Sequence, residues 1–217
     1  MVDDLPTWTV LVATLGQRTE RLKRLLDGLL PQTERYDGAV RVCALYNNGE
    51  RPLSEVRQDL IDEATTDYVS FVDDDDVVPD YFVDEVCARL GDVDYVGWQM
   101  QCYSDGVSLK PTYHSLRYSC WYDDDAGYYR DVSHLNPIRL QLARCVSYRG
   151  LVPPEDVSWA TQMRPHVKTE AYVDRVMYHY HASSGDSTWR PGTVSVRDSA
   201  RYNVLHANFS YNLRSST

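Results

Sequence analysis

The sequence predicts a single α/β domain with a mostly parallel central sheet and helices on both faces. Short apolar runs rich in β-branched residues alternate with amphipathic segments from residue 8 to residue 91. Strand–helix alternation of this kind favours a parallel sheet covered on both sides. A chain of 217 residues, 43% of them apolar, is long enough for one well-buried core. We find no internal repeat or linker that would divide it, so we expect one domain over residues 1–217.

Strands are expected at residues 8–14, 40–46 and 68–72, where apolar runs end in polar turns. The first helix follows residues 15–18. Its apolar face repeats at helical spacing and comprises Leu22, Leu25, Leu26, Leu29 and Leu30. Pro31 is expected to stop this helix, since proline disrupts a helix interior.

The next two helices follow the second and third strands. Ser54 is a candidate N-cap for a helix whose inner face carries Val56, Leu60, Ile61 and Ala64. A third helix starts after Pro79, places Phe82, Val83, Val86, Cys87 and Leu90 inward, and ends at Gly91.

The second half of the chain is less regular. We expect strands at residues 93–100, 116–121 and 171–181, and helices at residues 138–143 and 155–163. The chain from Arg190 onward is polar and poorly patterned.

Composition excludes several classes of protein. A formal charge of −10 argues against a broad nucleic-acid footprint, which needs clustered cations. No stretch approaches the ~20 apolar residues of a membrane span, and the first residues lack the pattern of a signal peptide. The five cysteines form no C-x-x-C pair and fit buried thiols in a reducing compartment. We therefore expect a cytoplasmic protein.

Four consecutive aspartates, Asp73–Asp76, follow the third apolar strand directly. In an open parallel sheet, ligands bind just beyond the carboxyl ends of the strands. Adjacent carboxylates repel one another, and a divalent cation relieves that repulsion. Oxygen ligands select Mg²⁺, Mn²⁺ or Ca²⁺, so the run is a candidate metal site. The second run, Asp123–Asp125, has no amphipathic helix after it and is interpreted as a solvated turn.

Three segments in order resemble the GT-A glycosyltransferases, especially the inverting family 2. FVDDDDVVPDYF (residues 71–82) is similar to the D-x-D region of that family, and WTVLVATLGQR with its Leu-rich helix is similar to its first strand, donor loop and helix. PPEDVSWATQM (residues 153–163) resembles the later ED element at a helix start. The resemblance covers most of residues 8–165 and implies the GT-A form of the α/β fold.

The resemblance implies a nucleotide-sugar site in residues 8–100. Asp73 and Asp75 would be the outer members of D-x-D, contacting the ribose and a diphosphate bound to Mn²⁺ or Mg²⁺. Asp74 would lie beside the donor and Asp76 would support the metal shell. Residues expected to face the nucleotide or its sugar are Thr14, Leu15, Gly16, Arg18 and, at the pocket edge, Trp98.

The turn after the second strand departs from the family pattern. The family has an Asp-rich turn there, whereas this chain has Asn47 and Asn48. An asparagine amide can still hold a base edge, because it both donates and accepts hydrogen bonds. A UDP-sugar remains the donor that the resemblance favours.

Residues 101–190 would form the acceptor and catalytic half, followed by a tail over residues 191–217. By the resemblance, Asp156 is the catalytic base and Glu155 positions the acceptor or the helix start. His179 and His181 share one face of a strand, and the resemblance implies that one of them reaches the metal. His134 is a candidate for the acceptor side. Residues 183–190, rich in Gly and Ser, are expected to form a lid over the donor.

The combined prediction is a metal-dependent glycosyltransferase that moves a sugar from a nucleotide-diphosphate sugar to a glycan or protein hydroxyl, with inversion. A nucleotidyltransferase is the enzymatic alternative, but it would need a second glycine in the loop that holds only Gly16. The other alternative is a catalytically inactive domain that binds a nucleotide-sugar or a metal.

Overall fold

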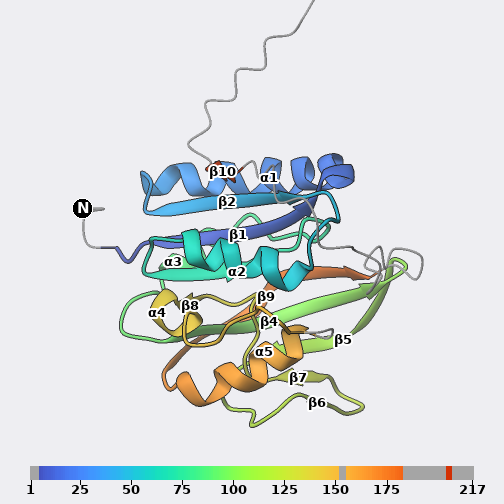
Figure 1. The fold of residues 1–217 in the computed structure, drawn as a ribbon. Coiled ribbons are helices and arrows are strands. Elements are labelled where there is room, and N and C mark those ends of the chain that lie inside the picture. The colour runs from blue at the N-terminus through green and yellow to red at the C-terminus, as the bar shows by residue number, and fades with distance from the viewer. Residues whose placement is uncertain (1–4, 152–154, 183–203, 207–217) are drawn as a thin grey trace, which may run out of the picture.

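One mixed sheet runs through the computed structural model, which describes residues 5–151, 155–182 and, for the backbone only, 204–206 (Figure 1). In spatial order its strands are β10-β2-β1-β3-β8-β4-β5-β7-β6, and β9 pairs with β4. The first half of the chain supplies β1 (Trp8–Leu15), β2 (Val40–Asn47), β3 (Tyr68–Phe71) and β4 (Tyr95–Ser104). The remaining strands are β5 (Val107–His114), β6 (Tyr122–Asp123), β7 (Tyr128–Arg130), β8 (Ile138–Arg139), β9 (Glu170–Ala182) and β10 (Val204–His206).

The strands β2, β1 and β3 form a parallel group, in which Trp8 pairs with Val40 on one side and Tyr68 on the other. Their carboxyl ends therefore meet at one edge of the sheet. The strands β4 and β9 are also parallel, whereas β8 joins β3 to β4 by antiparallel pairing. The prediction of a mostly parallel centre is confirmed, with antiparallel strands added around it.

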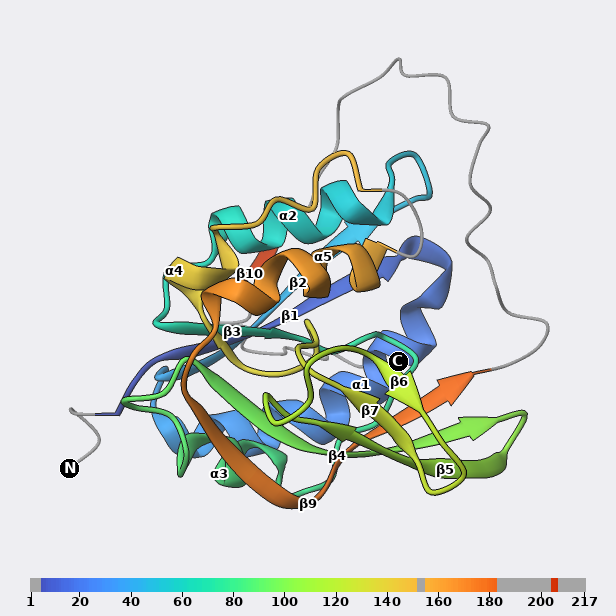
Figure 2. The same ribbon diagram turned by 90° about the horizontal axis from the view of Figure 1, so that it is seen from below.

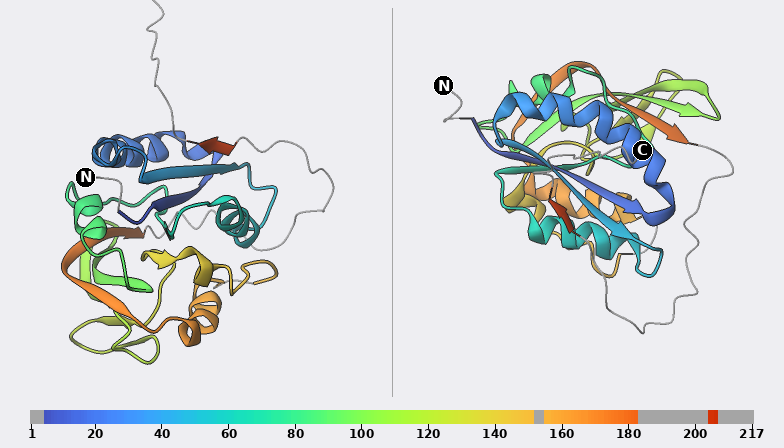
Figure 3. Two further views of the ribbon diagram at one scale, coloured as in Figure 1. Left: turned by 90° about the vertical axis from the view of Figure 1, so that its left-hand side faces the viewer. Right: turned by 90° about the horizontal axis from the view of Figure 1, so that it is seen from above.

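Helices cover both faces, as predicted. The helices are α1 (Thr19–Thr33), α2 (Leu53–Glu63), α3 (Phe82–Cys87), α4 (Leu140–Ala143) and α5 (Glu155–Met163). Seen from below, α1 and α3 lie on one side of the strands, and α2, α4 and α5 on the other (Figure 2). The two further views show the same separation (Figure 3). None of the described helices combines the length and apolarity that crossing a membrane requires.

Aromatic rings fill the core between α3 and the sheet. The ring of Phe82 lies 5.6 Å from that of Trp8 and 5.6 Å from that of Trp98. All three side chains are fully buried. Trp98 is thus a core residue and not the edge of a sugar pocket, which corrects the prediction from sequence.

Two helix boundaries differ from expectation. Helix α1 continues past Pro31 to Thr33, because Gln32 and Thr33 bond their side chains back to the carbonyls of Gly28 and Leu30 in the last turn. Helix α2 begins one residue before Ser54, which is buried in the first turn and makes no capping hydrogen bond.

Two segments of the second half also differ. Residues 116–121 form turns and no strand, since Ser115 holds the backbone of Arg117 and Tyr118 in a local turn. The predicted helix at 138–143 is split, because Ile138 and Arg139 fill the gap between β3 and β4 as β8. The lid expected over residues 183–190 lies outside the described residues.

Candidate active site

A cavity of about 190 Å³ opens at the carboxyl ends of β1, β2 and β3. Most of the residues predicted for the donor side line it. They are Thr14, Leu15, Arg18, Asn47, Asp73, Asp74, Asp75 and His181. The parallel register of the three strands is what gathers these side chains, since they follow strands far apart in sequence.

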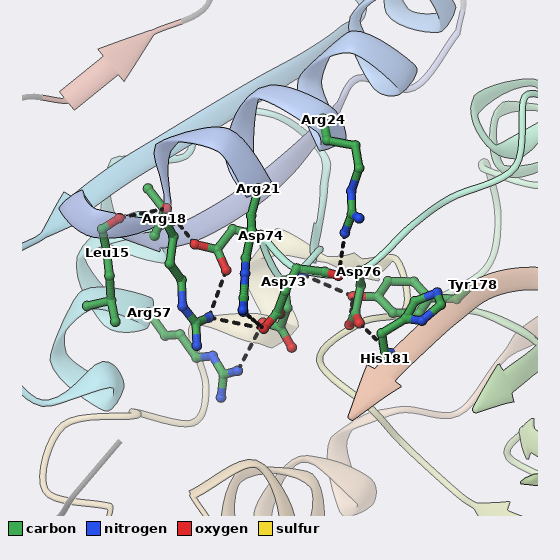
Figure 4. A network of polar contacts seen from close by, with 12 residues as sticks. Leu15, Arg18, Arg21, Arg24, Arg57, Asp73, Asp74, Asp76, Tyr178 and His181 are labelled. Atoms are coloured by element: carbon green, nitrogen blue, oxygen red, sulfur yellow. Dashed lines mark hydrogen bonds and ion pairs between the residues drawn. The ribbon is translucent and has the colours of Figure 1, made fainter. Parts of the chain in front are cut away.

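Asp74 is held by β1 and the turn before α1, and Asp75 by that turn and the start of α1. Asp74 is buried and accepts hydrogen bonds from Thr14 Oγ1 at 2.6 Å and Arg18 Nη1 at 2.9 Å. Asp75 is half-buried and pairs with Arg18 at 3.2 Å and Arg21 at 3.1 Å, while Arg24 donates to its carbonyl oxygen. Figure 4 shows the three arginines reaching from the start of α1 toward the aspartates. Cations at this position offset the repulsion within the acidic run.

Asp76 faces the opposite way, toward β9. It is buried and accepts hydrogen bonds at 2.8 Å from the Tyr178 hydroxyl and from the His181 N–H. Burial, reinforced by the charge of Asp73, raises the pKa of its carboxyl well above the ordinary value. The same Tyr178 oxygen accepts the N–H of Asp73 at 3.0 Å. Asp76 therefore fixes the acidic run to β9.

The two strand histidines do not turn their rings toward the carboxylates as predicted. The ring of His181 stacks on Tyr103 at 4.7 Å, and the Tyr103 hydroxyl lies 3.3 Å from His179 Nδ1. Side chains alternate along a strand, so Tyr178 and Tyr180 are the β9 residues on the side of the aspartates. His181 reaches Asp76 through its backbone N–H.

The loop after β1 packs tightly on the turn after β2. A Cβ on Gly16 would lie 2.5 Å from Asn48 Oδ1, so a larger residue there would displace the exposed Asn48 side chain. The Asn47 amide closes its own turn by donating to the Arg51 carbonyl and accepting the Arg51 N–H. Asn47 lines the cavity, while Asn48 is exposed beside it.

Arg57 contacts both the acidic run after β3 and Glu155 at the start of α5. It was not predicted from the sequence. This residue of α2 is 4% exposed and donates to Glu155 Oε1 at 2.9 Å and Asp73 Oδ1 at 3.4 Å. Its guanidinium lies 5.7 Å from the ring centre of Phe71. Arg57 lies next to Val56 on a helix with an apolar face. A charged residue at such a position indicates a buried partner of opposite charge, and this sequence pattern could have identified Arg57.

A second cavity, of about 430 Å³, adjoins the first. Asp156 lines it from the first turn of α5, and His134 lines it from the segment before β8. Arg57, Asp73 and Tyr180 line both cavities. Glu155 is buried and held by Arg57, whereas its neighbour Asp156 is half-buried. Of the two predicted catalytic carboxylates, Glu155 is thus fixed by its ion pair with Arg57, while Asp156 lines a cavity.

The acidic run fits a cation only in part. Across the described residues, no three His, Cys, Asp or Glu side chains assemble into a metal site. Asp73 and Asp75 nevertheless line the donor-side cavity together. Mg²⁺ is commonly held by one or two carboxylates plus substrate phosphates, not by a complete protein cage. These residues fit a cation whose shell a diphosphate completes.

The second acidic run is exposed, as predicted, with Asp123 at the end of β6 and Asp124 and Asp125 after it. Asp123, Asp124 and Asp125 are exposed, and Asp124 Oδ1 accepts the N–H groups of Ala126 and Gly127.

A family model described as Glycosyl transferase family 2 matches residues 5–149, more than half of the chain. The chain belongs to this family. Membership of this family favours the glycosyltransferase prediction over the nucleotidyltransferase alternative. No curated protein sequence matches the chain.

Solved structures of S. aureus TarS share the fold. The TarS 1-349 structure has a TM-score of 0.51 at 16% identity, over 81% of this chain and 60% of that one. The UDP complex gives 0.51 at 17% identity, over 82% and 61%, and the UDP-GlcNAc complex gives 0.52 at 17%, over 87% and 60%. This family 2 chain therefore spans about 60% of the length of these TarS structures.

Proposed function

We propose that this family 2 enzyme transfers a sugar from a nucleotide-diphosphate sugar to a hydroxyl acceptor, with inversion and with Mn²⁺ or Mg²⁺ as cofactor. One observation supports this most directly: two adjoining cavities share Arg57, Asp73 and Tyr180 as walls. The carboxylates that follow β3 line the first cavity, and Asp156 lines the second. Donor and acceptor would meet at the shared wall.

The donor binds in the first cavity. Its nucleotide lies against the loop from Thr14 to Arg18 and against Asn47, with the diphosphate toward Asp73 and Asp75. A UDP-sugar is the favoured donor, because the similar TarS structures include complexes with UDP and UDP-GlcNAc. Arg18 adds a cation beside the negatively charged diphosphate.

Asp73 and Asp75 hold the cofactor. A divalent cation there supplies charge neutralisation for the leaving diphosphate. Asp75 would exchange its contacts with Arg18 and Arg21 for contacts with the cation.

Asp156 acts as the general base. The acceptor oxygen forms its bond to the anomeric carbon while the bond from that carbon to the diphosphate oxygen breaks, and the acceptor proton passes to the Asp156 carboxylate. One displacement of this kind inverts the anomeric centre. A positioned base contributes typically about 10²–10⁴-fold. Glu155 acts indirectly, because its contact with Arg57 fixes the start of α5 beside Asp73.

Calorimetric titration of UDP tests the donor and cofactor together. We expect UDP to bind more tightly with Mn²⁺ than in EDTA, since Asp73 and Asp75 share the cation with the diphosphate. The Asp75→Asn variant should lose most of that difference, and the matched Asp123→Asn variant in the exposed second acidic run should retain it. Equal UDP affinity in Mn²⁺ and in EDTA would rule out the cofactor role.

A further inference from the structure

The second cavity has the dimensions of a ligand pocket and its own chemical character. Its volume of about 430 Å³ exceeds that of the donor-side cavity and lies within the usual range for small-molecule sites. Asp156 lies on its wall, so whatever binds there is placed beside the proposed base. The residues that line this cavity therefore indicate which chemical class of acceptor it binds.

One wall of this cavity is apolar and aromatic. It includes Met100, Leu109, Trp121 and Tyr128, which come from strands β4, β5 and β7 and from the segment before β6. Trp121 is anchored, because its Nε1 donates to the Val132 carbonyl at 3.1 Å. Its indole N–H is thus satisfied within the protein, and Trp121 offers a ligand its ring and no hydrogen bond.

His134 also lines this cavity, but its side chain is 6% exposed and both of its ring nitrogens are fully buried. Burial lowers the pKa of this imidazole well below its ordinary value, so it stays neutral. His134 therefore adds no charge to the cavity wall.

The charges on the described walls balance. Arg57 and Arg130 supply two cations, and Asp73 and Asp156 supply two carboxylates. Arg57 also contacts Glu155, which further reduces its attraction for an anion. A phosphorylated acceptor would approach two carboxylates without a surplus cation, and an amine would meet Arg130. The balance favours an uncharged ligand.

We propose that this cavity, the acceptor pocket, binds a neutral pyranose ring at the end of a glycan. A pyranose has C–H groups on its faces and hydroxyls around its rim. One face packs on Trp121 and Tyr128, while a rim hydroxyl contacts Asp156. This inference rests on the proposed function and selects a sugar over a protein side chain or a phosphorylated polyol as acceptor.

Saturation-transfer NMR with the full chain, UDP and diamagnetic Mg²⁺ tests the inference without turnover. The probes are methyl glycosides of glucose, galactose and N-acetylglucosamine, glycerol phosphate, and a blocked Gly-Ser-Gly peptide. We expect saturation of the ring C–H protons of at least one glycoside, and weaker or no signal from the phosphate and the peptide. Preferential binding of either of the last two, or no glycoside signal at about 10 mM, would overturn the proposal.

Variants then locate the binding. Trp121→Leu and Tyr128→Leu should each weaken glycoside binding about five- to tenfold, in line with the value of an aromatic contact. Tyr113→Leu is the matched control, since Tyr113 stacks on Tyr129 at 5.5 Å and is not among the cavity residues. Unchanged affinity in both pocket variants would contradict the proposal. Because nucleotide-sugar turnover is measured separately, failure here leaves the proposed reaction to its own test.

Discussion

At the scale of single residues, Arg57 is a buried charge that depends on its ion-pair partners. Its guanidinium is buried between Asp73 and Glu155, so it joins the acidic run after β3 to the start of α5. The partner Glu155 is itself 8% exposed. Removing one member of a buried ion pair leaves an uncompensated charge, and this costs much more than losing a surface pair.

We expect Arg57→Met to lower the free energy of unfolding by about 3 kcal/mol. Adding Glu155→Gln should recover part of that loss, because the stranded carboxylate is then neutral. Arg149→Met is the control, since Arg149 pairs with Asp59 and Asp62 at the surface and should cost below about 1 kcal/mol. Urea denaturation measures all three, and equal losses for Arg57→Met and Arg149→Met would contradict the account.

The sequence located some of these residues and missed others for a clear reason. Asp73, Asp75 and Asp156 follow strand ends or open a helix, so a local pattern reveals them. Tyr178 and Tyr180 reach the site only through tertiary packing, and no local pattern distinguishes them from core residues. The histidines of β9 illustrate the same limit, because their shared face was predicted correctly while the side on which the carboxylates lie was not.

At the scale of elements, two glycines have contrasting surroundings, one in a helix and one in a strand. Gly28 lies exposed inside α1, and a Cβ there would meet nothing within 4 Å. Gly97 lies in β4, where a Cβ would clash with Glu170 and lie 2.5 Å from the His114 carbonyl oxygen. The same substitution should therefore have opposite effects at the two positions.

Gly28→Ala should raise the free energy of unfolding by about 0.5–1 kcal/mol, because alanine loses less conformational entropy in a helix. Gly97→Ala should lower it by about 1–3 kcal/mol through overpacking. Thermal melts of the two variants beside the parent give the comparison. A stabilising Gly97→Ala would show that β4 and β9 pack less closely than described.

The end of β5 should make stability depend on pH. Burial lowers the pKa of His114 to about 4, although its Nδ1 lies 2.6 Å from Asn136 Oδ1, and Arg130 lowers it further. The unfolded chain then binds one more proton than the folded chain between about pH 6.5 and pH 4. The contribution of neutral His114 to the free energy of unfolding is thus fully present above about pH 6.5 and is lost as the pH falls toward 4.

The slope from this one group approaches about 1.4 kcal/mol per pH unit. The His114→Gln substitution removes this group. It should flatten the pH dependence of the free energy of unfolding, measured with urea between about pH 6.5 and pH 4, relative to the parent. Parallel curves for the two proteins would mean that His114 is protonated in the folded state.

At the scale of the whole molecule, the parallel group β2-β1-β3 explains why the site forms where it does. Strand–helix periodicity predicted these strands, and their shared carboxyl edge holds the donor-side cavity. The antiparallel additions β5 to β8 were less predictable, because β6, β7 and β8 are two or three residues long and are defined by their neighbours. Of these short strands, β7 lines the acceptor pocket through Tyr128 and Arg130, which helps to explain why sequence described the donor half of the site better.

The proposed reaction depends most on Asp156 acting as base from the second cavity. The decisive measurement is the rate of UDP release from a UDP-sugar chosen by thermal shift, for the parent, Asp156→Asn and the exposed-turn control Asp125→Asn. Asparagine keeps the shape of the side chain but cannot take the proton. We predict that Asp156→Asn loses at least ~10²-fold in kcat while its affinity for UDP stays within a few-fold and Asp125→Asn is unchanged. Near-normal turnover in Asp156→Asn would contradict the assignment.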